Sequence, residues 1–230
     1  MNKENYSNKA FTLAEVLITL GIIGIVAALT IPTLVNNYQK HQTAVALKKL
    51  YSVVSQIYSS AQADVGESSG WKPPTADWNS AASKVWWDEY FVPYMAVTKA
   101  CVTNNPSECW ASSSKFLDGG STAYGNSWYT FVLKDGSSVM LYAVSSSQAQ
   151  FFVDVNGAKE PNIVGKDIFF LIMWYPSETI RFAGVGAGRT WLLADNSSCC
   201  NKAPGVSKGS YCGAVIQADG WQIKDDYPWN

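Results

Sequence analysis

One continuous apolar segment constrains this chain more than any other feature. Residues 11–35 read FTLAEVLITLGIIGIVAALTIPTLV, and Glu15 is the only charged side chain among them. As a helix, the segment would reach roughly 37 Å, which exceeds the hydrocarbon core of a bilayer at about 30 Å. A secretory signal peptide would end its apolar core at a small-residue cleavage site, and none follows here. We therefore expect residues 11–35 to span a membrane.

Small residues and a proline interrupt the large apolar side chains of this segment. Gly21 and Gly24 lie in its middle, and Gly24 and Ala28 have the four-residue spacing that lets membrane helices approach closely. Glycine and alanine are also common in membrane helices for other reasons, so the spacing alone leaves both interpretations open. Pro32 removes the backbone hydrogen bond to the carbonyl of Ala28, which predicts a kink or a loosened turn.

The helix is expected to continue beyond the membrane segment. Residues 36–62 place their apolar side chains three and four positions apart, which predicts an amphipathic helix. These positions are Tyr38, Val45, Leu47, Leu50, Tyr51, Val54, Ile57, Tyr58 and Ala61. Lys40, Lys48 and Lys49 fall on the opposite side. The pattern therefore predicts one helix of about fifty residues, which is far longer than the usual globular helix.

Residues 8–35 resemble the N-terminus of type IV pilins and type II secretion pseudopilins. The resemblance rests on a short polar leader, a Phe that opens the apolar run, and a glutamate in strict register with it. In that family a prepilin peptidase cuts before the Phe and N-methylates it. The resemblance therefore implies cleavage between Ala10 and Phe11, with N-methylated Phe11 as the new N-terminus. Pro32 also matches a proline of type IVa pilins, whereas Ala10 replaces the usual glycine.

The resemblance also implies a role for the Glu15 carboxylate within the apolar segment. Cleavage would free the amine of Phe11, which supplies a cation for Glu15 where the sequence encodes no basic side chain. Glu15, Gly21, Gly24 and Pro32 are then expected to serve assembly. The implied partners are other pilin or pseudopilin subunits, the prepilin peptidase, an inner-membrane assembly platform and membrane lipid.

The remaining chain predicts an α+β domain. Asp135-Gly136 lies between alternating apolar segments in residues 128–144 and is a strong hairpin signal. Further strands are expected at residues 151–157 and Ile168–Tyr175, with edge strands at Trp191–Ala194 and Gly213–Gln217, and a short helix is expected at Ala82–Tyr94. Strands joined by short turns predict an antiparallel meander. We expect a pilin-like fold, in which a long N-terminal helix packs on an antiparallel sheet with disulfide-bounded loops.

The expected domain organisation has four parts. Residues 1–10 form a leader peptide, 11–35 the transmembrane and assembly helix, 36–62 its amphipathic continuation, and 63–230 an extracytoplasmic domain. Lysines before the apolar run and disulfide candidates after it favour a single-pass protein of the inner membrane with its N-terminus inside. After assembly, the domain would lie in a cell-surface or periplasmic filament.

Five cysteines occur, and none belongs to a C-x-x-C pair, which disfavours zinc and thioredoxin-like sites. Cys101 and Cys109 bracket a small loop that a disulfide could close. Cys212 can pair with Cys200 or with Cys199, which leaves one thiol unpaired. Disulfides are favoured because an exporting segment precedes these loop-like regions.

Asp154, Asn156 and Asp167 carry oxygen atoms that a Ca²⁺ ion could use. Their spacing does not match an EF-hand loop. Asp and Asn also supply turn geometry, and we prefer this interpretation. The sequence therefore predicts no cofactor and no metal site, with these three residues as weak calcium candidates.

Enzymatic function is disfavoured. The chain has one histidine, His41, and lacks the G-x-S-x-G, H-E-x-x-H and phosphate-binding loop motifs. No cluster of Lys and Arg occurs and the net charge is −1, so no nucleic-acid partner is expected. We expect a structural subunit of a type IV pilus or type II secretion pseudopilus. The alternative is a membrane-anchored adhesin that binds carbohydrate or cell wall through its ten tryptophans and twelve tyrosines, although such residues more often form core.

Overall fold

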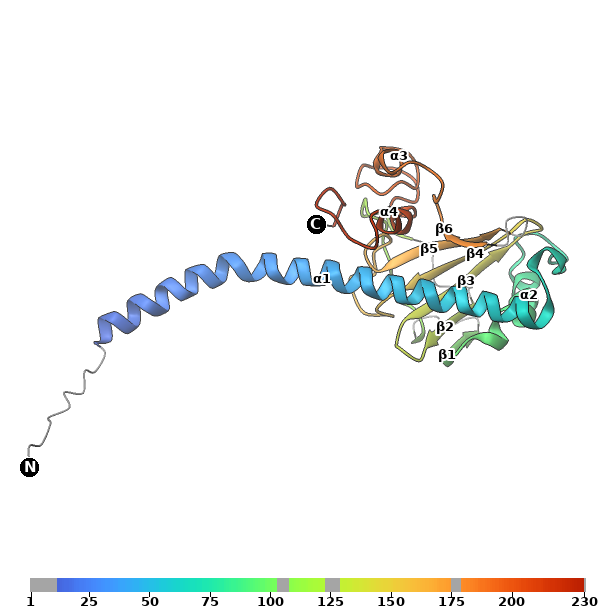
Figure 1. Cartoon of the computed structure of the whole chain (residues 1–230), viewed down its shortest axis with the longest axis horizontal. Coiled ribbons are helices and arrows are strands. Elements are labelled where there is room, and N and C mark those ends of the chain that lie inside the picture. The colour runs from blue at the N-terminus through green and yellow to red at the C-terminus, as the bar shows by residue number, and fades with distance from the viewer. Residues whose placement is uncertain (1–11, 103–107, 123–128, 175–178, 230) are drawn as a thin grey trace, which may run out of the picture. The chain divides into compact units, whose positions relative to one another are not determined.

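The computed structural model describes residues 12–102, 108–122, 129–174 and 179–229. The chain divides into two compact units, Met1–Lys40 and His41–Asn230. Figure 1 shows the order of the elements along the chain. The helices are α1 (Leu13–Val65), η1 (Ser68–Gly70), α2 (Ser80–Tyr90), η2 (Val92–Tyr94), α3 (Arg189–Leu193) and α4 (Cys212–Ala218). The strands are β1 (Val97–Val102), β2 (Tyr129–Leu133), β3 (Ser138–Val144), β4 (Gln148–Asp154), β5 (Ile168–Trp174) and β6 (Thr179–Phe182).

The strands form one antiparallel sheet in the order β1-β2-β3-β4-β5-β6 (Figure 1). The predicted Asp135-Gly136 hairpin joins β2 to β3. Gly136 adopts a φ of 86°, which suits glycine, and its N–H donates to the carbonyl of Leu133. Because each strand pairs with the next along the chain, the sheet is a meander, as the strand spacing predicted.

The second half of α1 covers one face of the sheet (Figure 1). Its buried side chains follow the predicted helical stripe and are Ala44, Leu47, Leu50, Val54, Ile57, Tyr58 and Ala61. They join a core built on strand positions that face the helix, such as Phe131, Val139 and Phe169. The Tyr51 hydroxyl donates to the Ile180 carbonyl at 2.9 Å. This face is the main hydrophobic core of the unit His41–Asn230.

A smaller cluster covers the opposite face of the sheet. Its buried members are Trp110, Ala111, Met140, Phe152, Val164 and Ile168. Met140 and Phe152 are direct cross-strand partners, so alternate residues of β3 and β4 supply the two faces. Residues from outside the sheet therefore cover both of its faces, with α1 on one face and Trp110 on the other.

The fold class is confirmed as α+β and pilin-like, but two strand predictions were wrong. Trp191–Ala194 lies mainly in helix α3, and Gly213–Gln217 lies in helix α4. A short apolar run does not distinguish a buried helix from a strand by periodicity. In α4 the backbone of Gly213 approaches the Phe182 ring so closely that a Cβ there would lie 2.3 Å from the ring. This approach places α4 against β6.

Candidate functional site

The first half of α1 exposes a continuous apolar surface within the unit Met1–Lys40. Its exposed large side chains are Leu13, Val16, Leu17, Ile18, Leu20, Ile22, Ile23, Ile25, Val26, Leu29, Ile31, Leu34 and Val35. The hydroxyls of Thr19 and Thr30 donate to helix carbonyls at 2.9 Å, so these two hydroxyls are satisfied within the helix. By length and composition this helix is long and apolar enough to cross a membrane.

The structure places the predicted assembly residues on this same helix. A Cβ added to Gly21 or Gly24 would meet no atom within 4 Å, so no contact within the described chain requires glycine there. Pro32 lies inside α1, which continues through it as one helix. The cleavage-site residues Ala10 and Phe11 lie outside the described residues.

Glu15 closes the N-terminus of α1 through a reciprocal capping arrangement. Its Oε2 accepts hydrogen bonds from the backbone N–H of Thr12 at 2.9 Å and from the Thr12 hydroxyl at 2.8 Å. The Glu15 N–H donates to the Thr12 hydroxyl oxygen at 3.3 Å. This is a capping box, and Thr followed three residues later by Glu is its sequence signal. The predictions from sequence did not include this cap. The described residues provide Glu15 with no basic partner.

Two disulfide bonds close loops of the domain. Cys101 bonds to Cys109, and Cys200 bonds to Cys212, with Cα–Cα distances of 6.0 and 4.8 Å. Cys199 is a free, buried thiol that donates to the Trp191 carbonyl at 3.3 Å. Burial raises the pKa of the Cys199 thiol, which disfavours the reactive thiolate.

Asp154, Asn156 and Asp167 lie together at the connection between β4 and β5. The Asn156 N–H donates to Asp154 Oδ1 at 3.1 Å, and the Asn156 amide nitrogen lies 3.4 Å from Asp167 Oδ2. Burial, followed by the charge of Asp167, raises the pKa of Asp154 well above its ordinary value. Burial also raises the pKa of Asp167. Within the described residues, no group of three or more His, Cys, Asp or Glu side chains could hold a metal ion.

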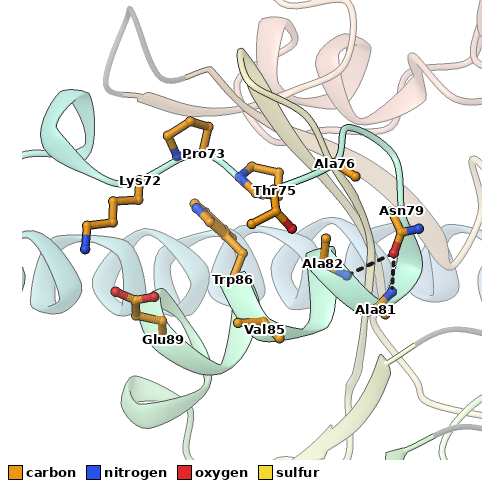
Figure 2. Close-up of a pocket in the computed structure, with 11 residues that line it drawn as sticks. Lys72, Pro73, Thr75, Ala76, Asn79, Ala81, Ala82, Val85, Trp86 and Glu89 are labelled. Atoms are coloured by element: carbon orange, nitrogen blue, oxygen red, sulfur yellow. Dashed lines mark hydrogen bonds between the residues drawn. The ribbon is translucent and has the colours of Figure 1, made fainter.

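A cavity of about 580 Å³ lies between the segment Pro73–Ala76 and helix α2. Figure 2 shows Trp86 of α2 extending toward this segment, with Lys72 and Glu89 at one end, and Val85 of α2 also lines the cavity. The side chain of Asn79 caps α2 by accepting from the N–H groups of Ala81 and Ala82 (Figure 2). The residues that line this cavity include no histidine and no cysteine, so they do not form a nucleophile–base pair of the His or Cys type.

Most of the described tryptophans belong to the core. Trp71, Trp86, Trp87, Trp110 and Trp229 are buried. Trp71 and Tyr90 stack with ring centroids 4.7 Å apart, and Trp86 and Trp87 meet edge to face. Trp78 and Trp191 are about half exposed. The aromatic content is therefore used mainly for packing, and it does not favour an adhesive surface.

Two family models match the chain. Residues 33–230 match a family of unknown function (DUF6613), and residues 5–31 match the prokaryotic N-terminal methylation motif. No curated protein and no solved structure matches. The motif covers the apolar start of α1 and supports a prepilin segment of the type IV pilin and pseudopilin type.

Proposed function

We propose a structural role for this chain, which belongs to a family of unknown function (DUF6613) and carries a prokaryotic N-terminal methylation motif. The chain is a type IV pilin- or pseudopilin-like precursor. Our proposal is that it works as a non-enzymatic subunit of a type IV pilus or a type II secretion pseudopilus. The observation that carries the proposal is the exposed apolar surface of α1 next to a glutamate that the motif includes.

Processing comes first in the proposed sequence of events. The prepilin peptidase removes the leader, residues 1–10, between Ala10 and Phe11 and methylates the amine of Phe11. Residues 11–35 anchor the chain in the inner membrane with the N-terminus inside, and the amphipathic segment 36–62 connects this anchor to the extracytoplasmic domain, residues 63–230. A filament forms when an assembly platform brings several such helices together.

Helix packing then replaces lipid as the environment of α1. The positions of Gly21 and Gly24 have no neighbour within the described chain, which leaves room for a second helix to approach. In the assembled state Glu15 exchanges its capping bonds with Thr12 for a pair with the amine of Phe11 in the same or a neighbouring subunit. An amine on the neighbouring subunit favours one register between helices.

A photo-crosslinking amino acid tests the proposed packing. Introduced at Leu20 of the full-length protein in its native host, it is expected to give covalent adducts with other pilin-like subunits, because this side chain is 60% exposed on the apolar half of α1. The matched control carries the probe at the exposed Lys48, on the half of α1 that packs on the sheet. Adducts from Leu20 that contain only lipid or only unrelated proteins would contradict the proposal.

A further inference from the structure

The segment 73–76 passes over helix α2, and hydrogen bonds hold the chain on both sides of it (Figure 2). Before this segment, the backbone N–H of Lys72 donates to the Tyr90 hydroxyl at 3.1 Å. After it, the two carboxylate oxygens of Asp77 accept from the Ser146 N–H at 2.7 Å and from the Ser146 hydroxyl at 3.1 Å. Two adjacent prolines between these anchors have a restricted φ. The space beneath the segment is therefore preformed.

Small side chains of α2 leave this space open. Ala81, Ala82 and Val85 line the cavity on the helix side, and Trp86 extends from α2 toward the segment above (Figure 2). The volume of about 580 Å³ lies within the range of about 300–1,000 Å³ that is typical of small-molecule sites. Val85 is 66% exposed, so the cavity is accessible from solvent. The walls offer a small molecule a largely apolar surface.

Two opposite charges lie at one end of this cavity. Figure 2 shows the Lys72 ammonium and the Glu89 carboxylate there. Burial raises the pKa of the Tyr90 hydroxyl, and the Glu89 carboxylate adds to this effect although the bond from the Lys72 N–H opposes it. Both charged side chains are exposed, and neither takes part in an ion pair with the described part of the chain. Both charges are therefore available to a ligand.

A ligand that matches this cavity has an apolar body and carries an anion and a cation together at one end. A neutral sugar would leave both charges without a partner, and a peptide carries its two terminal charges at opposite ends. An α-amino acid carries both charges on one carbon atom, from which its side chain extends. We propose that the cavity between residues 73–76 and α2 binds one free α-amino acid with a large apolar side chain. Lys72 pairs with its carboxylate and Glu89 with its ammonium group.

Burial of the ligand side chain contributes most of the affinity. Because Lys72 and Glu89 are exposed, each ion pair contributes modestly, whereas contact with Val85 and Trp86 removes apolar surface from water. The charges mainly select a zwitterion among ligands of similar apolar size. All the lining residues belong to the unit His41–Asn230, so the site does not depend on the proposed role in a filament.

Calorimetric titration of the full-length protein in lipid nanodiscs with L-phenylalanine tests the proposal. We expect saturable binding of one phenylalanine per chain. The analogues 3-phenylpropionate, which lacks the ammonium group, and phenethylamine, which lacks the carboxylate, should each bind about three- to tenfold more weakly. Glycine, which lacks the apolar side chain, should give no measurable heat of binding. Absence of saturable phenylalanine binding would overturn the proposal, and so would an analogue that binds as tightly as phenylalanine.

Variants of α2 locate the bound amino acid. Ala82→Phe fills the cavity from the helix side and should abolish binding. Glu89→Gln keeps the size of the side chain but removes the charge, so binding should weaken about three- to tenfold. Asp88→Asn is the matched control, since Asp88 is also an exposed carboxylate of α2 but pairs with Lys84 and does not line the cavity. It should bind phenylalanine like the wild type.

A second charge variant keeps the test valid if Ala82→Phe does not fold. Lys72→Met removes the ammonium group and keeps an unbranched side chain, and it should also weaken binding about three- to tenfold. Unchanged phenylalanine binding in the folded variants at Ala82, Glu89 and Lys72 would overturn the proposal, because the amino acid would then bind elsewhere. Equal weakening by Asp88→Asn would also overturn it, because the effect would then follow from the net charge of α2.

Discussion

Glu15 has one use in the structure and a different one in the proposed filament. In the structure it accepts from Thr12 and closes the N-terminus of α1, and in the proposed filament it pairs with the amine that cleavage creates at Phe11. The two uses differ in what they require. Capping needs an acceptor oxygen, whereas the pair needs a negative charge.

Substitutions of Glu15 separate these two uses. Glu15→Leu removes both the acceptor and the charge, whereas Glu15→Gln keeps an acceptor for the Thr12 N–H and removes only the charge. We expect both variants to insert normally and both to be recovered in filaments at least tenfold less than the wild type. Recovery is measured by immunoblotting sheared filaments and membranes separately. Normal assembly of Glu15→Gln would show that the charge is not needed.

Arg189 provides a second residue-scale prediction, at the C-terminal end of the domain. Its guanidinium donates to both oxygens of Asp219, at 2.6 and 2.9 Å, and to both oxygens of Asp226. Burial raises the pKa of the Asp219 carboxyl, but hydrogen bonds from Arg189 and Lys224 outweigh it, so the pKa lies below its ordinary value.

A carboxyl with a lowered pKa stabilises the folded state above its unfolded pKa, which is about 3.9 for Asp. That contribution disappears as the pH falls through the lower folded pKa. Arg189→Gln should therefore cost about 1–2 kcal/mol at pH 7, discounted for the partial exposure of Arg189. The cost should shrink below about pH 4. Urea unfolding at both pH values measures it, and a cost that is equal at pH 7 and pH 3 would contradict the assignment.

At the scale of elements, α1 combines two halves with different environments. The first half exposes its apolar side chains, whereas the second half buries a stripe against the sheet. The stability of the domain is therefore expected to depend on the second half.

Leu50 tests this dependence because it is 1% exposed in the main core. Leu50→Ala leaves a cavity and should lower the free energy of unfolding by about 2–5 kcal/mol. Val45→Ala is the matched control on the same helix, since Val45 is 51% exposed, and it should change stability by no more than about 0.5 kcal/mol. Urea unfolding of the detergent-solubilised protein checks both variants. Equal losses in the free energy of unfolding for the two variants would mean that the buried stripe of α1 does not stabilise the core more than the exposed side of the helix does.

At the scale of the whole molecule, long periodic patterns predicted structure better than short ones. The long helix followed from extended periodicity and the hairpin from the specific Asp135-Gly136 turn signal. The short apolar run at Ile168–Tyr175 correctly predicted β5, although similar short runs were misassigned elsewhere. The strands β1 and β6 were missed because four to six residues provide too little pattern. Helix α4 was predicted as a strand, because the contacts that place it, such as that between Gly213 and Phe182, join distant parts of the chain.

For the candidate sites, too, local patterns were visible in the sequence, whereas groupings that depend on the folded chain were not. The apolar run and Glu15 were visible because their arrangement is local. The grouping of Asn162 with Asp154 and Asp167 depends on the folded path of the β4–β5 connection, so spacing alone did not indicate it. Spacing also left open which cysteine pairs with Cys212, and in the structure it is Cys200.

In the proposed function, proteolysis and methylation convert this membrane-anchored precursor into a subunit with a charged N-terminus beside Glu15. Intact-mass spectrometry of the protein extracted from membranes tests it most directly. We expect a mass that lacks residues 1–10 and gains one methyl group on Phe11, and we expect the full-length mass in cells without the prepilin peptidase. A full-length, unmethylated mass in cells that contain the active peptidase would contradict the claim.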